Sequence, residues 1–351
     1  MDSFEEILHK ANNLQASDVH FSAGTPPTGR VNGVLVKLYE EKLTPQTIDE
    51  YAKELMDKHQ AEAFEERGEV DFALSVQNLG RFRINVFKQR GSTAIAARIL
   101  NARIPEPNTL GIPQCVVDIT NKRRGLVLVT GATGSGKSTT LASLINIINQ
   151  KYSYHVITLE DPIEYLHRHS ASVVNQREIG SDTRSYAAAL RAALRQDPDV
   201  ILVGEMRDLE TISIAVTAAE TGHLVFSTLH TIGAANTIDR IIDVFPPYQQ
   251  QQIRTQLADV LECVVSQQLI AKKDGDGRVA AIEVLLVNSA VRNLIREGKT
   301  FQIPSIIQTG RRAGMITMDD ALYELYQSDV ISRESAVSYA QDRSYLVKKL
   351  G

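Results

Sequence analysis

The chain has 351 residues, 43% of them hydrophobic and 23% charged, which excludes a disordered chain and fits about two globular domains. The formal net charge is -4, and the mixed signs along the chain leave no dense basic block of the kind that neutralises nucleic-acid phosphates. We therefore expect no nucleic-acid partner.

Cysteine spacing and hydrophobic runs bear on where the protein works. Cys115 and Cys263 lie far apart without ligand-like spacing, so we expect neither a zinc site nor a disulfide framework. The acidic, amphipathic start of the chain lacks the features of a signal peptide, and no stretch approaches the roughly 20 apolar residues of a membrane span. The expected location is the cytoplasm, without direct membrane insertion.

The first third of the chain mixes helical and strand patterns. We predict a helix over residues 2–15, strand structure over 30–39 and a helix over 45–66. In GRFRINVF, hydrophobic and polar side chains alternate with the period of a half-buried strand. Arg81 and Arg83 should therefore project from the same face of a sheet.

A proline-rich stretch separates this region from the rest of the chain. Residues 102–114, ARIPEPNTLGIPQ, contain three prolines and a glycine, which neither a helix nor a strand ladder accommodates. We predict a linker there, between an N-terminal domain of residues 1–101 and a larger domain of residues 115–351.

Downstream, apolar runs alternate with helical patterns. Strands are predicted over residues 126–130, 155–159, 200–203 and 224–228. This alternation is typical of a largely parallel sheet with crossover helices, so the fold class is α/β. From about residue 289 onward the sequence predicts only short amphipathic helices, which form a helical C-terminal part.

A phosphate-binding loop follows the first of these strands. Gly131-x4-Gly136-Lys137-Ser138 lies between an apolar strand and a helical pattern, where backbone N–H groups and a helix N-terminus can bind ATP phosphates. Lys137 should reach the β- and γ-phosphates, and the Ser138 hydroxyl should ligate Mg²⁺. The predicted nucleotide-binding residues are Gly131, Ala132, Thr133, Gly134, Ser135, Gly136, Lys137, Ser138 and Thr139.

The strand at residues 200–203 ends in Gly204 and Glu205. Many P-loop enzymes have a Mg²⁺-binding aspartate at the position that Gly204 occupies here. We predict that Glu205 is a catalytic residue and holds Mg²⁺ through water. The alternative is an ordinary exposed carboxylate at a strand end.

The strand at residues 155–159 leads into Glu160, Asp161 and Glu164. Carboxylates at the C-terminal ends of parallel strands face the crevice where α/β sheets bind ligands. We predict that Glu164 orients and deprotonates the attacking water, because Pro162 turns the chain back toward the site. The alternative is that these carboxylates only cap a turn.

Two histidines, His223 and His230, bracket the strand at residues 224–228. A single histidine near a sheet is usually structural, but two around one strand resemble a sensor of the γ-phosphate. We predict a nucleotide contact for His223 and a catalytic role for His230, with the structural interpretation left open.

Together these blocks resemble the type II/IV secretion motor ATPases, and among them the type IV pilus retraction ATPases. The similar segments extend over nearly the whole chain. They are ASDVHFS, GRFRINVF, TGATGSGKSTTLAS, ITLEDPIEYLH, VGEMRD, TGHLVFSTLHT, RIIDVFP and AVRNLIREGK. In the last segment, Val291 stands where the family usually has isoleucine.

The resemblance implies a PAS-like N-terminal domain joined to a RecA-like ATPase domain, with six copies forming a ring. It also implies that Glu205 belongs to the Walker B block and that Glu164 is the catalytic glutamate. Arg81, Arg83 and Arg98 would close over the nucleotide and neutralise charge on the transferred phosphoryl group. The alternative for these arginines is a basic strand face in solvent.

The same resemblance implies a motor that retracts type IV pili in twitching motility and meets the inner membrane through a pilus platform protein. Extension and type II secretion members carry a longer N-terminal region and a four-cysteine zinc insert, neither of which is found here. This favours retraction. The alternatives are a ring ATPase for DNA or conjugative transport or for type II secretion, and a P-loop module without turnover.

The segment at residues 290–297 predicts an amphipathic helix. Its apolar face carries Val291, Leu294 and Ile295, and another face carries Arg292 and Arg296. Since other residues already provide for the phosphates and the water, we interpret this helix as an element that transmits force.

Overall fold

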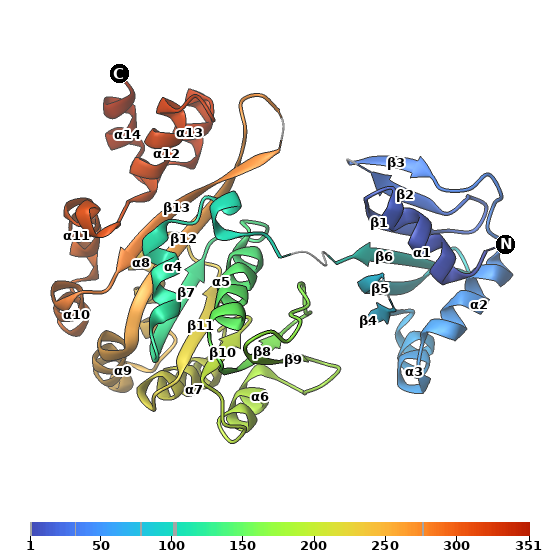
Figure 1. Ribbon diagram of the computed structural model, residues 1–351, viewed down its shortest axis with the longest axis horizontal. Coiled ribbons are helices and arrows are strands. Elements are labelled where there is room, and N and C mark those ends of the chain that lie inside the picture. The colour runs from blue at the N-terminus through green and yellow to red at the C-terminus, as the bar shows by residue number, and fades with distance from the viewer. Residues whose placement is uncertain (1, 32, 78, 101–103, 276) are drawn as a thin grey trace. The chain divides into compact units, whose positions relative to one another are not determined.

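The computed structural model describes residues 2–31, 33–77, 79–100, 104–275 and 277–351. The chain divides into two compact units, residues 1–103 with 164–166 and residues 104–163 with 167–351 (Figure 1). We call these the first and the second unit. In the described part of the chain, no helix has the length and apolar character needed to cross a membrane.

The first unit is an antiparallel sheet of six strands in the order β3-β2-β1-β6-β5-β4, packed against three helices. Its strands are β1 (Ala16–Phe21), β2 (Thr28–Val31), β3 (Val34–Lys37), β4 (Glu69–Val76), β5 (Gly80–Gln89) and β6 (Ser92–Ile99). Its helices are α1 (Phe4–Asn13), α2 (Pro45–Leu55) and α3 (Lys58–Arg67). Phe82, Ile84 and Val86 of β5 are fully buried while Arg83 is exposed, so the predicted alternation is confirmed.

Two elements of the first unit differ from the prediction. The single helix expected over residues 45–66 is two helices, because Met56 is extended and Asp57 caps α3 in a capping box with Gln60. The strand structure expected over residues 30–39 is part of a hairpin, since the chain reverses at Gly33, whose φ is 81°.

The second unit contains a seven-stranded sheet in the order β13-β12-β7-β11-β10-β8-β9. All neighbouring pairs are parallel except β12 with β13. The strands are β7 (Gly125–Thr130), β8 (His155–Glu160), β9 (Val173–Glu178), β10 (Val200–Val203), β11 (Leu224–Leu229), β12 (Leu261–Ala271) and β13 (Arg278–Leu286). The four predicted strands are confirmed as β7, β8, β10 and β11, and the α/β class with them.

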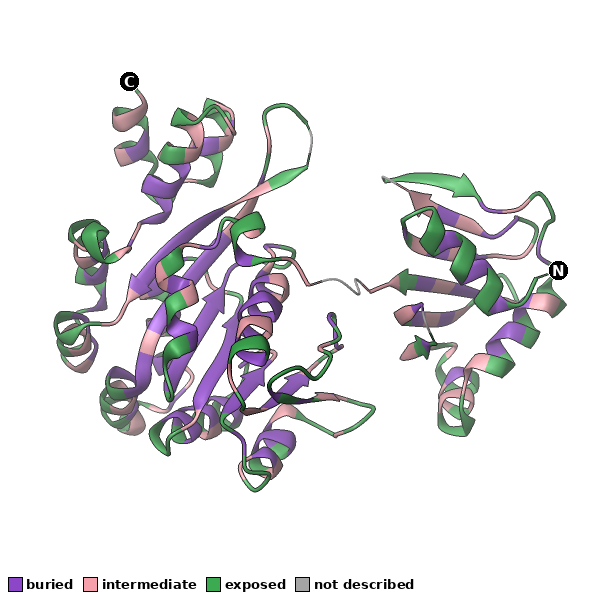
Figure 2. Cartoon of the chain, viewed as in Figure 1, coloured by how far each residue is buried: buried purple, intermediate pink, exposed green. Residues whose placement is uncertain are grey.

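Helices cover both faces of this sheet (Figure 2). One face packs on α4 (Gln114–Val117) and α5 (Lys137–Lys151). The other packs on α6 (Tyr186–Ala193), α7 (Leu209–Glu220), α8 (Ala234–Asp243), α9 (Pro247–Val260), α10 (Ser289–Arg296) and α11 (Ile303–Thr309). In β7, Leu126 and Leu128 are buried on the second face and Val127 and Val129 on the first, as expected for a central strand of a parallel sheet.

The C-terminal helices form a small module of their own at one edge of the sheet. They are α12 (Met318–Gln327), α13 (Arg333–Tyr339) and α14 (Arg343–Leu350). Met318, Leu322 and Leu346 of this module pack with Ile270 and Ala281 of β12 and β13. We call α12, α13 and α14 the C-terminal module.

The predicted linker at residues 102–114 is too long. Pro107–Leu110 forms a short 3₁₀ helix, and Pro107 and Ile112 are buried, Ile112 in the core of the second unit. Prolines prevented the prediction of structure here, but an apolar residue between them still gains by burial. Residues 102 and 103 lie outside the described part of the chain.

Candidate active site

The phosphate loop connects β7 to α5 at the C-terminal edge of the parallel strands (Figure 1). Gly131, Gly134 and Gly136 have φ values of 142°, 78° and 89°, which residues with side chains rarely adopt. A Cβ on Gly131 would lie 2.2 Å from the backbone carbonyl oxygen of Gln267, and a Cβ on Gly136 would lie 2.8 Å from the side-chain Nε2 of Gln267. The glycines therefore allow the loop to lie directly against β12.

Positive charge and hydrogen-bond donors are concentrated in the loop. Lys137 is only 8% exposed, and its Nζ donates to the carbonyl oxygens of Gly131 and Ala132 at 2.9 and 3.0 Å. Ser135 is also buried, and its hydroxyl has no hydrogen-bond partner among the described residues. A phosphate oxygen would satisfy this hydroxyl and would face both the ammonium group and the positive end of α5. The residues of the loop thus fit the phosphates of ATP.

Gln267 is a residue of this site that the sequence did not indicate. Its Oε1 accepts a hydrogen bond from the Thr140 hydroxyl of α5 at 2.8 Å, and both residues are buried. Gln267 thereby connects β12 to the first turns of the helix that follows the loop. The available signal was a pair of adjacent glutamines in a mostly apolar strand, since buried polar side chains need partners.

Glu205 lies just beyond β10 and is held by two neighbours. Its Oε1 is 2.7 Å from Nε of Arg207, and its Oε2 is 3.3 Å from Nε2 of His230. The three residues line a cavity of about 320 Å³ together with Thr228. The structure thus brings Glu205 and His230, each predicted separately to be catalytic, together at the same edge of the sheet as the phosphate loop, since Leu229 accepts a hydrogen bond from Gly131.

The absence of a side chain at Gly204 has a steric cause. A Cβ there would lie 2.8 Å from the Tyr186 hydroxyl oxygen and 3.0 Å from the carbonyl oxygen of Leu159. Burial, with the nearby charge of Glu205, raises the pKa of Tyr186, so this phenol stays protonated. An aspartate at this position would have to displace the Tyr186 side chain.

The acidic block after β8 divides into a bound part and an exposed part. Glu160 Oε1 accepts hydrogen bonds from the Thr158 hydroxyl at 2.6 Å and from Nε2 of Gln176 at 3.1 Å. Glu164 lies on the loop that follows and is exposed, without a hydrogen bond or ion pair to any other described residue. Its assignment as catalytic glutamate stays a prediction.

His223 lies far from the phosphate loop of the same chain, and its contact with the nucleotide stays a prediction. His223 precedes β11, whose first residue pairs with Gly125 at the start of β7, whereas the loop follows the end of β7. Strand residues rise about 3.3 Å each, so His223 and His230 lie about 23 Å apart. His223 instead lies 2.9 Å, through Nδ1, from the Ala218 carbonyl oxygen. Two residues that bracket a strand necessarily lie at its opposite ends.

The three predicted arginines lie in the first unit. Arg81 and Arg83 are two residues apart on β5, and Arg98 of β6 is directly opposite Arg83, so the three share one face of the sheet. Arg83 is 3.5 Å from an Asp71 carboxylate oxygen, and Arg98 is 2.8 Å from one of Asp18. Their action on a nucleotide stays a prediction.

Comparison with known proteins identifies the family. The model of the family described as "Type II/IV secretion system protein" matches residues 2–337. The chain belongs to this family. It is 47% identical over 331 residues to a type IV pilus retraction ATPase, PilT, of Pseudomonas aeruginosa, covering 94% of this chain and 96% of that protein. It is also 47% identical over 316 residues to a twitching motility protein of Neisseria gonorrhoeae, covering 90% and 84%.

A solved structure of another member of the type II/IV secretion family supports the same conclusion. The crystal structure of the pilus retraction motor PilT with bound ADP has a TM-score of 0.93 and 50% sequence identity, covering 99% of this chain and 100% of that one. The predicted fold class and the predicted ATP-hydrolysing activity are confirmed by this membership. The resemblance to pilus retraction ATPases, which rested on sequence blocks, is confirmed as well.

Proposed function

We propose that the chain is a motor ATPase that couples ATP hydrolysis to the retraction of type IV pili. The observation that carries this proposal is the near full-length likeness to pilus retraction ATPases, which includes the first unit as well as the phosphate loop. The geometry agrees with it, because Lys137, Ser135 and the start of α5 form an anion-binding loop beside Glu205.

Five polar residues have distinct tasks in this proposal. Lys137 and the N–H groups of the loop bind the β- and γ-phosphates. Ser138, in the first turn of α5, and Glu205, through water, would hold Mg²⁺, which supplies charge neutralisation on the phosphates. His230 orients the Glu205 carboxylate, to which it is close. Glu164 orients the attacking water and accepts its proton.

We further propose that six copies form a ring and that catalysis depends on it. Arg81, Arg83 and Arg98 share one sheet face of the first unit, where Arg83 pairs with Asp71 and Arg98 pairs with Asp18. Such arginines would neutralise charge on the transferred phosphoryl group and contribute about 10³ to 10⁵ in rate. During phosphoryl transfer, Arg83 and Arg98 would have to exchange their aspartate partners for phosphate oxygens.

The mechanical output requires a partner at the membrane. We infer that the ring works on the cytoplasmic side and meets the inner membrane through a pilus platform protein rather than by inserting into it. No role for nucleic acid is part of this proposal.

The proposal is tested in a strain that lacks the chain. Such a strain should carry surface pili and fail to withdraw them, and expression of the unmodified chain should restore retraction whereas Lys137→Ala should not. Normal retraction with a defect in secretion or DNA uptake would contradict the proposal. Phosphate release by the purified chain that depends on added DNA would favour the transport alternative.

A further inference from the structure

Three buried polar side chains form a row across the sheet beside the phosphate loop. Ser266 of β12 pairs with Thr130 of β7 on one side and with Glu283 of β13 on the other. None of the three is more than 4% exposed. Thr130 immediately precedes Gly131, so the row begins at the loop and ends at the edge strand that carries the C-terminal module.

The row fixes the start of α8. The Ser266 hydroxyl accepts the N–H of Gly233 at 2.9 Å, and Oε1 of Glu283 accepts the N–H of Ala234 at 2.7 Å. The first turn of a helix leaves such N–H groups without partners inside the helix, so these bonds satisfy buried donors. Only residues 231–233 separate this turn from His230.

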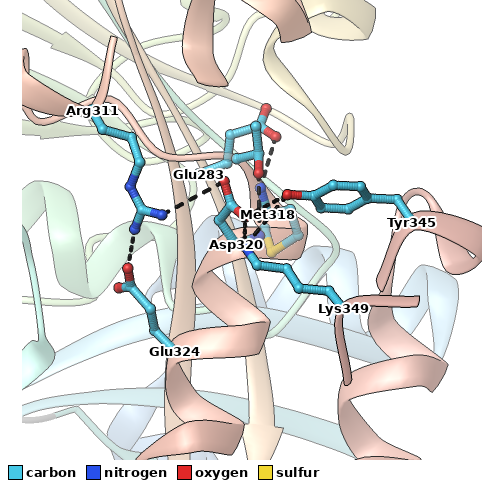
Figure 3. A network of polar contacts seen from close by, with 8 residues as sticks. Glu283, Arg311, Met318, Asp320, Glu324, Tyr345 and Lys349 are labelled. Atoms are coloured by element: carbon cyan, nitrogen blue, oxygen red, sulfur yellow. Dashed lines mark hydrogen bonds and ion pairs between the residues drawn. The ribbon is translucent and has the colours of Figure 1, made fainter. Parts of the chain in front are cut away.

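The second oxygen of Glu283 reaches the C-terminal module (Figure 3). Its Oε2 accepts the N–H of Met318, the first residue of α12, at 3.2 Å. Asp320 of the same turn accepts a hydrogen bond from the Tyr345 hydroxyl at 3.1 Å and pairs with Lys349, which ties α12 to α14. One buried carboxyl group therefore binds the N-termini of two helices that lie far apart in the sequence.

This arrangement makes the positions of the two helices interdependent. A carboxylate is favoured at both positive helix ends, and both of its oxygens accept N–H groups. Burial raises the pKa of Glu283, and the N–H groups of Ala234 and Met318 act in the opposite direction. If the start of α8 shifts, either a buried hydrogen bond is lost or α12 follows, because a buried donor without a partner is costly.

We propose that Glu283 is a positioning residue that couples the phosphate-loop edge, through the first turn of α8, to the C-terminal module. The inference rests on the ATPase activity of the family and on none of the roles proposed above for Glu164 or the arginines. The hydrogen bonds of Glu283 described above go to α8 and α12 rather than to the phosphate loop. Glu283 acts through the segment that carries His230.

The first test is Glu283→Gln in the full-length chain. An amide keeps the shape but must present its NH₂ to one of the two N–H donors, so one helix loses its acceptor. We expect kcat to fall about tenfold while KM for ATP stays within about twofold, because only coupling is lost. Glu324→Gln is the matched control, since Glu324 is an exposed carboxylate of α12 that pairs with Arg311, and it should leave both constants unchanged. An unchanged kcat in folded Glu283→Gln would overturn the proposal.

A second measurement needs no variant and holds even if Glu283→Gln does not fold. Hydrogen exchange of the unmodified chain is compared with and without a non-hydrolysable ATP analogue and Mg²⁺. The first turns of α8 and α12 should change their protection together. If protection changes at the phosphate loop and at α8 but not at α12, the coupling by Glu283 is overturned while the proposed ATP site stands. No change at the phosphate loop would count against the proposed ATP site as well.

Discussion

The hydroxyl oxygen of Tyr186 lies 2.8 Å from the place that a Cβ on Gly204 would occupy. Tyr186 begins α6 and Gly204 follows β10, so the two elements meet where other P-loop enzymes have an aspartate. The glycine at this position thus makes room for the Tyr186 side chain of α6. Glu205 is the first carboxylate after β10.

Gly204→Ala should therefore destabilise the chain by about 1–3 kcal/mol, because the added methyl group would overpack against the Tyr186 hydroxyl and the Leu159 carbonyl. Urea denaturation of the variant measures this cost. In a background of Tyr186→Phe the cost should be smaller, because the hydroxyl oxygen is gone and only the Leu159 carbonyl remains close. Equal costs in both backgrounds would show that the hydroxyl is not the obstacle.

Ser135→Ala should weaken nucleotide binding by about five- to tenfold with little effect on stability, because the hydroxyl has no partner in the described chain to lose. Titration with a fluorescent ADP analogue measures the affinity. Ser143→Ala is the control, since its hydroxyl is likewise buried without a described partner but lies farther along α5. Equal losses of affinity in the two variants would contradict a phosphate contact of Ser135.

The two glutamates should divide the catalytic work. Glu164→Gln should bind ATP with Mg²⁺ normally but lose turnover, because only the polarisation of water is removed. Glu205→Gln should also stop turnover, and it should weaken the dependence on Mg²⁺ because Glu205 and His230 lie at the loop edge. Binding and phosphate release are measured over a Mg²⁺ titration. Near-normal turnover of Glu164→Gln would reassign the base to Glu205.

The two arginines of α10 are not equivalent, although the sequence placed them on one face. Arg292 is 22% exposed, donates to the carbonyl oxygens of Ala258 and Asp259 and pairs with Glu262. Among the described residues, the Arg296 side chain pairs with Asp259 alone. Arg292→Ala should cost about 1–3 kcal/mol by leaving these acceptors unpaired.

Arg296→Ala should change stability by less than about 0.5 kcal/mol and leave ATPase activity intact. If α10 transmits force, the same variant should nevertheless retract pili poorly. Thermal unfolding, phosphate release and a twitching assay separate these effects. A parallel loss of ATPase activity in Arg296→Ala would instead place the helix in the catalytic or assembly machinery.

Specific ATPase activity should rise with protein concentration if sites are completed between copies, because association follows mass action. Light scattering measured alongside phosphate release gives the assembly state at each concentration. A monomer that hydrolyses ATP at the full rate per site would contradict ring-dependent catalysis.

The sequence predicted the parts of the fold that local patterns determine. The alternation in GRFRINVF and the apolar runs of β7, β8, β10 and β11 correspond to real strands because hydrophobic periodicity reports burial directly. The prediction of one helix over residues 45–66 was wrong because it overlooked Asp57, the N-cap at which a second helix begins. Strands β9, β12 and β13 had not been delimited.

The phosphate loop could be predicted because its residues are consecutive, but the strand that packs against it, β12, could not. Gln267 lies against the loop because β12 pairs with β7, and no local pattern encodes that pairing. The two histidines show the same limit. His223 and His230 are close in sequence, but β11 runs between them and places them at opposite ends of the strand. Which residues share an edge of a sheet follows from strand direction, and direction is a property of the whole fold.

The contact between Thr140 and Gln267 joins residues 127 positions apart. A ribosome therefore releases the whole loop sequence long before it synthesises the strand that supports the loop, and non-local contacts of this kind form late. Nascent chains that end before β12 contain every residue of the phosphate loop but lack the strand that packs against it. Nucleotide binding should then begin only after β12 has left the exit tunnel, which makes ATP affinity a marker of the emergence of β12.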